Sequence, residues 1–289
     1  MSQFKIKFWG TRGSIPSPGP KTMRYGGNTS CVEIDAGGAL SILDAGTGMR
    51  ELGDELLARL KGGPINANIY ITHTHWDHIQ GFPFFVPAYV PGNKLRLHGP
   101  HGMGKSFEKV FRDLLDPNNF PVDLGDMRSD ISFVEVKGGP MEYDGVKVLT
   151  SFTNHPGMDL AYRFERGGKI VVYLTDHEPY CSMHEKNDFF QKQDNAVTEF
   201  CRGADLLIAD AQYTDEEYLK KRTWGHSRYK DTVQLAADAD VKKLALFHHD
   251  PYHPDDILEG IGKDAERLAK ETGKKFDCFL AAEGQALEI

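Results

Sequence analysis

Short apolar runs, many of them rich in β-branched residues, recur along the chain, and segments with helical spacing of apolar residues lie between some of them. Short bounded apolar runs predict strands, whereas a period near 3.6 predicts helices. The predicted strands are 4–9, 31–35, 39–43, 67–72, 94–98, 132–136, 146–152, 159–165, 169–174, 205–209, 243–247 and 276–280. The predicted helices are 48–60, 104–115, 193–202, 214–222, 229–239 and 255–272.

The order of these elements indicates an α/β fold. Strands follow one another in the first part of the chain and alternate with helices later. We therefore predict two sheets packed face to face with helices on their outer sides, a four-layer αββα sandwich. We find no repeat, low-complexity stretch or linker, so we predict that residues 1–289 form a single domain.

Composition and net charge limit the classes of function that the chain can have. The chain is 40% hydrophobic and 26% charged, which is typical of an ordinary globular protein. Its 34 Lys and Arg residues against 42 Asp and Glu residues give a net charge of −8. Such a surface repels long polyanions on average, so a dedicated binder of long nucleic acids is disfavoured.

The spacing of the cysteines and the length of the apolar segments indicate in which cellular compartment the protein is expected. Cys31, Cys181, Cys201 and Cys278 form no CxxC pair, which favours reduced thiols over a disulfide framework. The first residues lack the apolar core of a signal peptide, and no segment is apolar over the length of a membrane span. We expect a cytoplasmic protein without a membrane segment.

The segment at 69–81 carries the strongest chemical signal. It begins as an apolar strand and becomes polar at its end, in the order His73, Thr74, His75, Trp76, Asp77 and His78. Side chains two apart on a strand point the same way, so His73 and His75 project together, and a turn after Trp76 brings Asp77 and His78 to them. Imidazole and carboxylate groups at this spacing are typical of zinc ligands. The alternative, surface histidines on a solvated turn, requires a rare coincidence.

Three further candidates follow predicted strands in the same manner. They are His155 after 146–152, Asp176 after 169–174 and His248 after 243–247. Open sheets deliver functional side chains at the carboxyl ends of their strands, so these residues are expected to share one rim with the histidine motif.

The motif and several other segments resemble the metallo-β-lactamase superfamily, and most closely its phosphodiesterase branch, which includes ribonuclease Z and small cyclic phosphodiesterases. The other segments are Phe8 to Pro16, Asn28 to Ser30, Leu43 to Gly48, Gly225 to Ser227 and Leu246 to Pro251. The resemblance implies an αββα fold and two divalent metal ions, zinc foremost, with manganese or iron as alternatives. It assigns His73, His75 and His155 to one metal, Asp77, His78 and His248 to the other, and Asp176 to a bridge between them.

The resemblance also implies catalytic roles for Asp77, His226 and Asp210. His226 lies in the loop Trp224 to Arg228, and Asp210 ends an apolar strand. A carboxylate can hold the orientation of an imidazole and raise its affinity for a proton. Asp210 departs from the glutamate of ribonuclease Z, and the alternative for His226 is a structural loop residue before a helix.

The length of the segment between His155 and Asp176 indicates the size of the substrate. The tRNA-processing relatives carry a long arm in this interval, whereas here it holds one predicted hairpin. We therefore expect a small phosphodiester, such as a cyclic nucleotide or a related cyclic phosphate, cleaved by a metal-activated hydroxide. The alternative is a thiol-ester or other acyl hydrolase, of the glyoxalase II or lactamase kind. Residues 179–190 are either a wall over the pocket or the start of a core-facing helix. The sequence does not decide whether the protein forms a homodimer.

Overall fold

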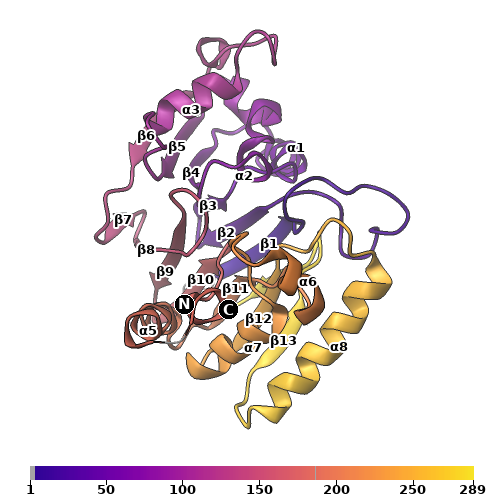
Figure 1. Ribbon diagram of the computed structural model, residues 1–289. Coiled ribbons are helices and arrows are strands. Elements are labelled where there is room, and N and C mark those ends of the chain that lie inside the picture. The colour runs from indigo at the N-terminus through magenta and orange to yellow at the C-terminus, as the bar shows by residue number, and fades with distance from the viewer. Residues whose placement is uncertain (1–3, 186) are drawn as a thin grey trace.

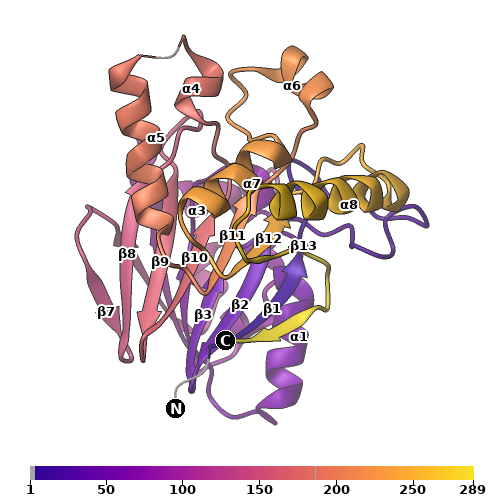
Figure 2. The same ribbon diagram turned by 90° about the horizontal axis from the view of Figure 1, so that it is seen from below.

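The computed structural model describes residues 4–185 and 187–289 as two seven-stranded sheets packed face to face, with helices on the outside (Figures 1 and 2). This confirms the predicted α/β sandwich. The first sheet has the order β14-β1-β2-β3-β4-β5-β6 and the second β13-β12-β11-β10-β9-β8-β7. The C-terminal strand β14 therefore pairs with β1 in the first sheet, although the segments before it belong to the second.

The strands and helices have the following bounds. The first sheet contains β1 (Phe4–Gly10), β2 (Cys31–Ala36), β3 (Ala39–Leu43), β4 (Asn66–Tyr70), β5 (Lys94–Gly99), β6 (Asp130–Glu135) and β14 (Ala286–Glu288). The second contains β7 (Met141–Tyr143), β8 (Val146–Phe152), β9 (Leu160–Arg166), β10 (Lys169–Leu174), β11 (Leu206–Asp210), β12 (Lys243–Phe247) and β13 (Asp277–Leu280). The helices are α1 (Met49–Arg59), α2 (Trp76–Ile79), α3 (Phe107–Leu114), α4 (Tyr180–Met183), α5 (Asp188–Cys201), α6 (Asp215–Lys221), α7 (Tyr229–Asp238) and α8 (Asp255–Glu271), with 3-10 turns η1 (Phe82–Phe84), η2 (Val86–Tyr89) and η3 (Leu124–Asp126).

The elements that the pattern analysis missed are short. The edge strands β7 and β14 have three residues each, which is too few for a period to be visible. The helices α2 and α4 have four residues each. Helix α5 begins at Asp188 rather than at 193, because the Asn187 side chain accepts a hydrogen bond from the backbone N–H of Phe190 and caps the first turn.

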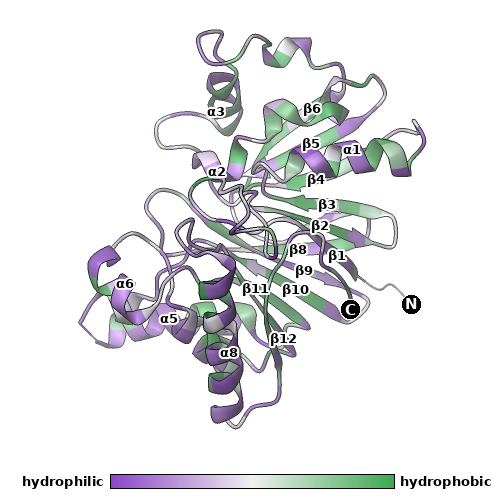
Figure 3. Ribbon diagram, turned by 90° about the vertical axis from the view of Figure 1, so that its right-hand side faces the viewer, coloured by the Kyte–Doolittle hydropathy of each residue, from purple (hydrophilic) through white to green (hydrophobic). Residues whose placement is uncertain are grey.

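Side chains alternate in direction along the strands and thereby divide the core into layers. On β10, Val171 and Tyr173 face the other sheet, whereas Val172 and Leu174 face the outer helices. Such alternation is what a strand with two covered faces requires. Figure 3 shows hydrophobic residues along the strands of both sheets. In the described part of the chain, no helix is both long and apolar enough to cross a membrane.

Parallel pairing positions the functional edge. Strands β3 to β6 are parallel in the first sheet, and β10 to β13 are parallel in the second. Parallel strands end at one edge, so the residues that follow β3, β4, β10, β11 and β12 can meet there. The two sheets are joined under this edge, because the hydroxyl of Tyr173 on β10 donates a hydrogen bond of 2.9 Å to Asp44, which follows β3.

Candidate metal centre

The first cluster of ligand-type atoms contains three histidines from the two halves of the chain. His73 follows the end of β4, and its Nε2 lies 2.8 Å from Nδ1 of His75. Nε2 of His155, which follows β8, lies 3.1 Å from the same Nδ1 atom. His73 is buried and His75 is exposed, so this cluster opens to solvent on the side of His75. The family resemblance had assigned these three residues to one metal.

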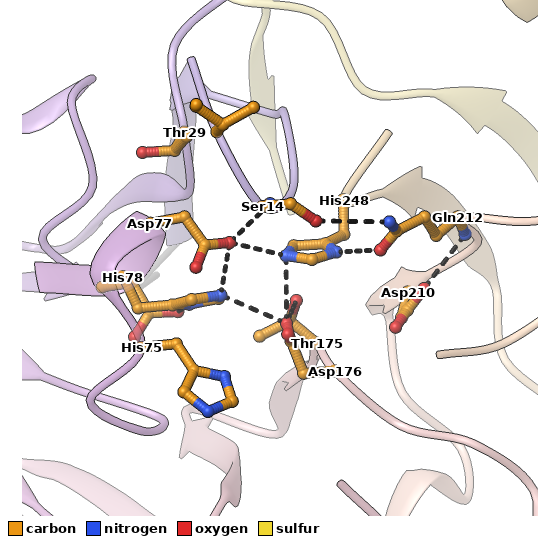
Figure 4. A network of polar contacts seen from close by, with 12 residues as sticks. Ser14, Thr29, His75, Asp77, His78, Thr175, Asp176, Asp210, Gln212 and His248 are labelled. Carbon is orange, nitrogen blue, oxygen red and sulfur yellow. Dashed lines mark hydrogen bonds and ion pairs between the residues drawn. The ribbon is translucent and has the colours of Figure 1, made fainter. Parts of the chain in front are cut away.

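The second cluster is formed by Asp77, His78 and His248. The expected turn after Trp76 is the short helix α2, which carries Asp77 and His78. Oδ2 of Asp77 lies 3.2 Å from Nε2 of His78 and 3.3 Å from Nε2 of His248, as Figure 4 shows. All three residues are buried.

Asp176 lies between the two clusters. Its Oδ1 is 3.3 Å from Nε2 of His78 and 3.2 Å from Nε2 of His248 (Figure 4). Its Oδ2 is 3.8 Å from Nε2 of His73 and 3.7 Å from Nε2 of His155. One carboxylate therefore faces both clusters, with a different oxygen toward each. The structure brings all seven predicted ligands to one edge.

Polar contacts on the far side of the rings orient four of the histidines. Nδ1 of His78 contacts Asp44 at 2.8 Å, and Nδ1 of His73 contacts Asp159 at 3.2 Å. Nδ1 of His155 donates to the carbonyl of Gly225 and Nδ1 of His248 to the side-chain oxygen of Gln212, at 3.0 and 2.9 Å. Metal-binding histidines characteristically hydrogen-bond in this way through the nitrogen that does not bind the metal.

The remaining nitrogens fit a cation. Nε2 of His78 is buried and makes no hydrogen bond to any described residue, although two carboxylates lie within 3.3 Å. Burial lowers the pKa of His73, His75 and His155 to about 4, so these rings are neutral at neutral pH, which is the form that binds metal ions. Burial opposes ionisation of Asp176, but the neighbouring histidines hold its pKa well below the ordinary value. The three neutral imidazoles of the first cluster, beside the ionised carboxylate of Asp176, suit a divalent metal.

The predicted acid-base pair lies beside the clusters. Nδ1 of His226 is 2.8 Å from Oδ2 of Asp210, and the other oxygen of Asp210 accepts the backbone N–H of Gln212 at 3.0 Å. Burial disfavours a charge on His226, but the Asp210 carboxylate raises its pKa to about 9. The His226 ring stacks on that of His248 with centroids 5.0 Å apart. The pair is therefore packed directly against a predicted metal ligand.

Residues 41–249 match the family described as the beta-lactamase superfamily domain. The chain belongs to this superfamily. It is 25% identical to the Ribonuclease Z of Archaeoglobus fulgidus, over 99% of this chain and 98% of that protein, and 25% identical to the Ribonuclease Z of Haloferax volcanii, over 99% and 95%. The metallo-β-lactamase fold protein YhfI from Bacillus subtilis superposes with a TM-score of 0.71 at 18% identity, with both chains fully covered. Unliganded yeast PDE1 gives a TM-score of 0.70 at 14% identity, again with both chains fully covered.

These likenesses establish the metallo-β-lactamase fold of this superfamily member, and the family with its His and Asp clusters makes it a metal-dependent hydrolase. The predicted fold and enzyme class are thereby confirmed. The roles of the individual site residues stay predictions, which the geometry supports.

Other residues of this superfamily member were not foreseen as parts of the site. Asp159 and Gln212 hold His73 and His248, and the backbone N–H of Ser14 donates a 2.7 Å hydrogen bond to Asp77. The available signals were the position of Asp159 as the first residue of a predicted strand and that of Ser14 in the glycine-rich N-terminal loop. Which ring each residue contacts depends on how the strands pair.

Backbone strain is concentrated at this edge. Ser14, Asp44, Asp176 and His248 have φ angles between 51° and 65°, although none is glycine. Such conformations cost of order 1–3 kcal/mol each and persist where the surrounding structure enforces them, often at functional sites. Asp176 and His248 are thus strained predicted ligands, and Asp44 and Ser14 are strained partners of ligands.

The other histidines have structural contacts. His177 accepts the backbone N–H of Asn154, and His249 donates to the carbonyl of Ala281. His98 and His253 are also buried. The strand β5 places His98 between the two sheets, where its ring stacks on that of Tyr70 with centroids 4.7 Å apart.

Of the two alternatives for the segment 179–190, the start of a core-facing helix is wrong. The described residues of the segment include α4 and the first turn of α5, and Phe189 is 63% exposed. The buried residues of α5 lie further along the helix, at Val197 and Cys201. Its first turn therefore extends beyond the core.

Proposed function

We propose that the chain hydrolyses small phosphodiesters, such as a cyclic nucleotide or a related cyclic phosphate, at a binuclear metal site. The observation that carries the proposal is the position of Asp176, whose two oxygens face two separate ligand clusters beside the His226–Asp210 pair. Zinc is the metal that these ligands favour most, with manganese and iron as alternatives. Asp77 would contribute charge to the second cluster, and Asp176 to both clusters.

The chemistry follows from the charge of the substrate. Two adjacent cations, when bound, would hold the phosphate, stabilise the added negative charge of the transition state and activate water. Asp210 fixes the ring of His226 through its 2.8 Å contact with Nδ1. His226 would then give a hydrogen bond or a proton to the leaving oxygen, as a positioned general acid.

The size of the substrate is inferred from the segment between His155 and Asp176. The antiparallel hairpin of β9 and β10 fills it, which leaves no room for an arm that could hold a large RNA. The alignment with the Archaeoglobus fulgidus Ribonuclease Z runs over 331 positions, more than the 289 residues of this chain, so that relative has residues that this chain lacks. The net charge of −8 also favours a small substrate over a long polyanion.

The relatives named Ribonuclease Z support a phosphodiester as the bond that is cleaved, since RNA is a polymer of phosphodiesters. A thiol-ester or other acyl hydrolase would use the same ligand set, because the fold hosts several chemistries. The His226–Asp210 pair is the feature that favours the diester. The small-substrate proposal and this alternative predict different products, so one experiment separates them.

The test combines metal analysis with three substrates on the purified protein. We expect two metal ions per chain, hydrolysis of bis(p-nitrophenyl) phosphate and of a cyclic nucleotide, and little turnover of a thiol ester. Chelator and His248→Ala should each abolish the diesterase activity, whereas His184→Ala, a histidine outside the clusters, should not. Efficient cleavage of a tRNA precursor instead would overturn the small-substrate proposal, and turnover of the thiol ester alone would establish the acyl hydrolase.

A further inference from the structure

Two adjoining cavities lie beside the exposed edge of the metal centre. The first, of about 250 Å³, is lined by His73, His75, Met103 and Met158. The second, of about 490 Å³, is lined by the rings of Trp76, Phe84 and Phe120. Thr74 and Val110 line both cavities, so the aromatic cavity continues from the ligand cluster.

The aromatic cavity presents rings to solvent. Trp76 is 78% exposed and directly follows the predicted ligand His75. Phe84, at the end of η1, is 54% exposed and packs edge-on against Phe120, with centroids 5.3 Å apart at 79°. Exposed aromatic groups that cluster at one place mark binding surfaces rather than scattered surface residues. The volume is also within the usual range of small-molecule sites.

The polar groups of this cavity are neutral or already paired. Gln80 and Asn119 contribute amide groups, which both donate and accept hydrogen bonds. Asp113 is the one charged side chain among the described residues that line it, and it is bound by Lys105 at 2.6 Å and by Lys109. A neutral planar group with polar edges therefore fits this cavity better than a phosphate or a sugar does.

We propose that this cavity, formed around Trp76, Phe84 and Phe120, binds the nucleobase of a nucleotide diester whose phosphate lies at the metal centre. Trp76 stacks on the base, and the amides of Gln80 and Asn119 contact its edge. Because Trp76 directly follows His75 and the two cavities share Thr74 and Val110, the base site adjoins the ligand cluster, as the base and phosphate of one nucleotide require. This rests on the proposed function for the phosphate, and it selects a nucleotide over a cyclic sugar phosphate.

The experiment compares two ligands that differ only in the base. Binding of adenosine 5′-monophosphate and of ribose 5-phosphate to the metal-loaded protein is measured by calorimetry. The nucleotide should bind more tightly, since stacking on an aromatic side chain stabilises a bound base. Trp76→Ala should weaken the nucleotide about tenfold or more and leave ribose 5-phosphate unchanged, whereas Trp76→Phe should keep most of the affinity.

Two further variants make the test specific. Phe84→Ala should weaken the nucleotide by a smaller factor than Trp76→Ala does. Phe189→Ala removes an exposed aromatic ring that lines neither cavity, and it should have no effect. Loss of affinity in Phe189→Ala but not in Trp76→Ala would assign the base to the 179–190 segment and overturn the proposal. So would equal affinity of the wild type for the two ligands.

The binding test is independent of turnover. If the nucleotide binds through Trp76 but no diester is cleaved, the base site stands and the proposed phosphodiesterase fails. If diesters are cleaved and Trp76→Ala binds the nucleotide like the wild type, the base site fails and the phosphodiesterase stands. Trp76 is largely exposed, so its replacement is expected to leave the fold intact, which a thermal melt would verify.

Discussion

The two halves of the chain contribute to the metal centre in different ways. The N-terminal half places four ligand-type residues within the single stretch from His73 to His78, at the end of β4 and the start of α2. The C-terminal half places His155, Asp176 and His248 there from three separate strand ends. The first group is assembled by local chain geometry, and the second by the pairing of β8 to β12.

This distinction between the halves is only partial, because residues of the C-terminal half contact the ligands of the N-terminal half or the residues that orient them. His73 in the N-terminal group is oriented by Asp159, which precedes β9 in the second sheet. Asp44, which orients His78, accepts a hydrogen bond from Tyr173 on β10. Each half therefore depends on the other for the orientation of its ligands, and mutations can measure how strongly.

The largest effect is expected at the residue that faces both groups. Asp176→Asn removes the charge that lies between the clusters, so metal content should fall below two ions per chain and diester hydrolysis should become undetectable. Elemental analysis and hydrolysis of bis(p-nitrophenyl) phosphate measure the two effects. Asp188→Asn on α5, an exposed acid outside the clusters, is the matched control. Full metal content and activity in Asp176→Asn would show that the two groups act independently.

A large effect on turnover alone is expected for the pair that only the C-terminal half contributes. His226→Ala should lower kcat by roughly 10²–10⁴-fold, the usual contribution of a general acid, with metal content unchanged. Asp210→Asn should act in the same direction, and the double variant should lose less than the product of the two factors, because the residues work as a unit. Unchanged turnover would assign His226 to structure.

A smaller effect is expected at the contact that joins the halves. Asp159→Asn weakens the orientation of His73, so metal affinity should fall by about 10–100-fold, as is typical for partners of metal ligands. Competition with a chromogenic chelator measures the dissociation constant. Asp44→Asn tests the corresponding contact of His78. An affinity equal to that of the wild type in both variants would mean that the histidine motif is positioned by its local chain alone.

The least effect on the metal centre itself is expected from a change at the interface of the two sheets, away from the ligands. Burial lowers the pKa of His98 to about 3, so its ring is neutral in the folded protein and takes up a proton near pH 6.5 when unfolded. Because the unfolded chain binds more protons below pH 6.5, this group lowers the free energy of unfolding as the pH falls from 6.5 toward 3, by up to about 1.4 kcal/mol per pH unit. His98→Gln should therefore show a shallower acid dependence in urea unfolding than the wild type. Parallel curves would place the acid sensitivity elsewhere.

The sequence by itself determined the local features of this protein. The proximity of His73 and His75 was readable because side-chain direction along an extended chain has a period of two, and that of Asp77 and His78 from the expected turn after Trp76, which is helix α2. The αββα architecture was readable because strands and helices have different periods, and most element positions were confirmed within a few residues. The three-residue strands β7 and β14 escaped, since pairing rather than pattern defines them.

The tertiary structure alone decided which distant residues meet. His155, Asp176 and His248 were anticipated from their places after strands, but the partners Asp159 and Gln212 were not, because polar contacts between separate strand ends depend on sheet order. The same holds for the cavity around Trp76. Its rings come from segments that fold against one another only once the first sheet and its helices are packed, and no period along the chain encodes that contact.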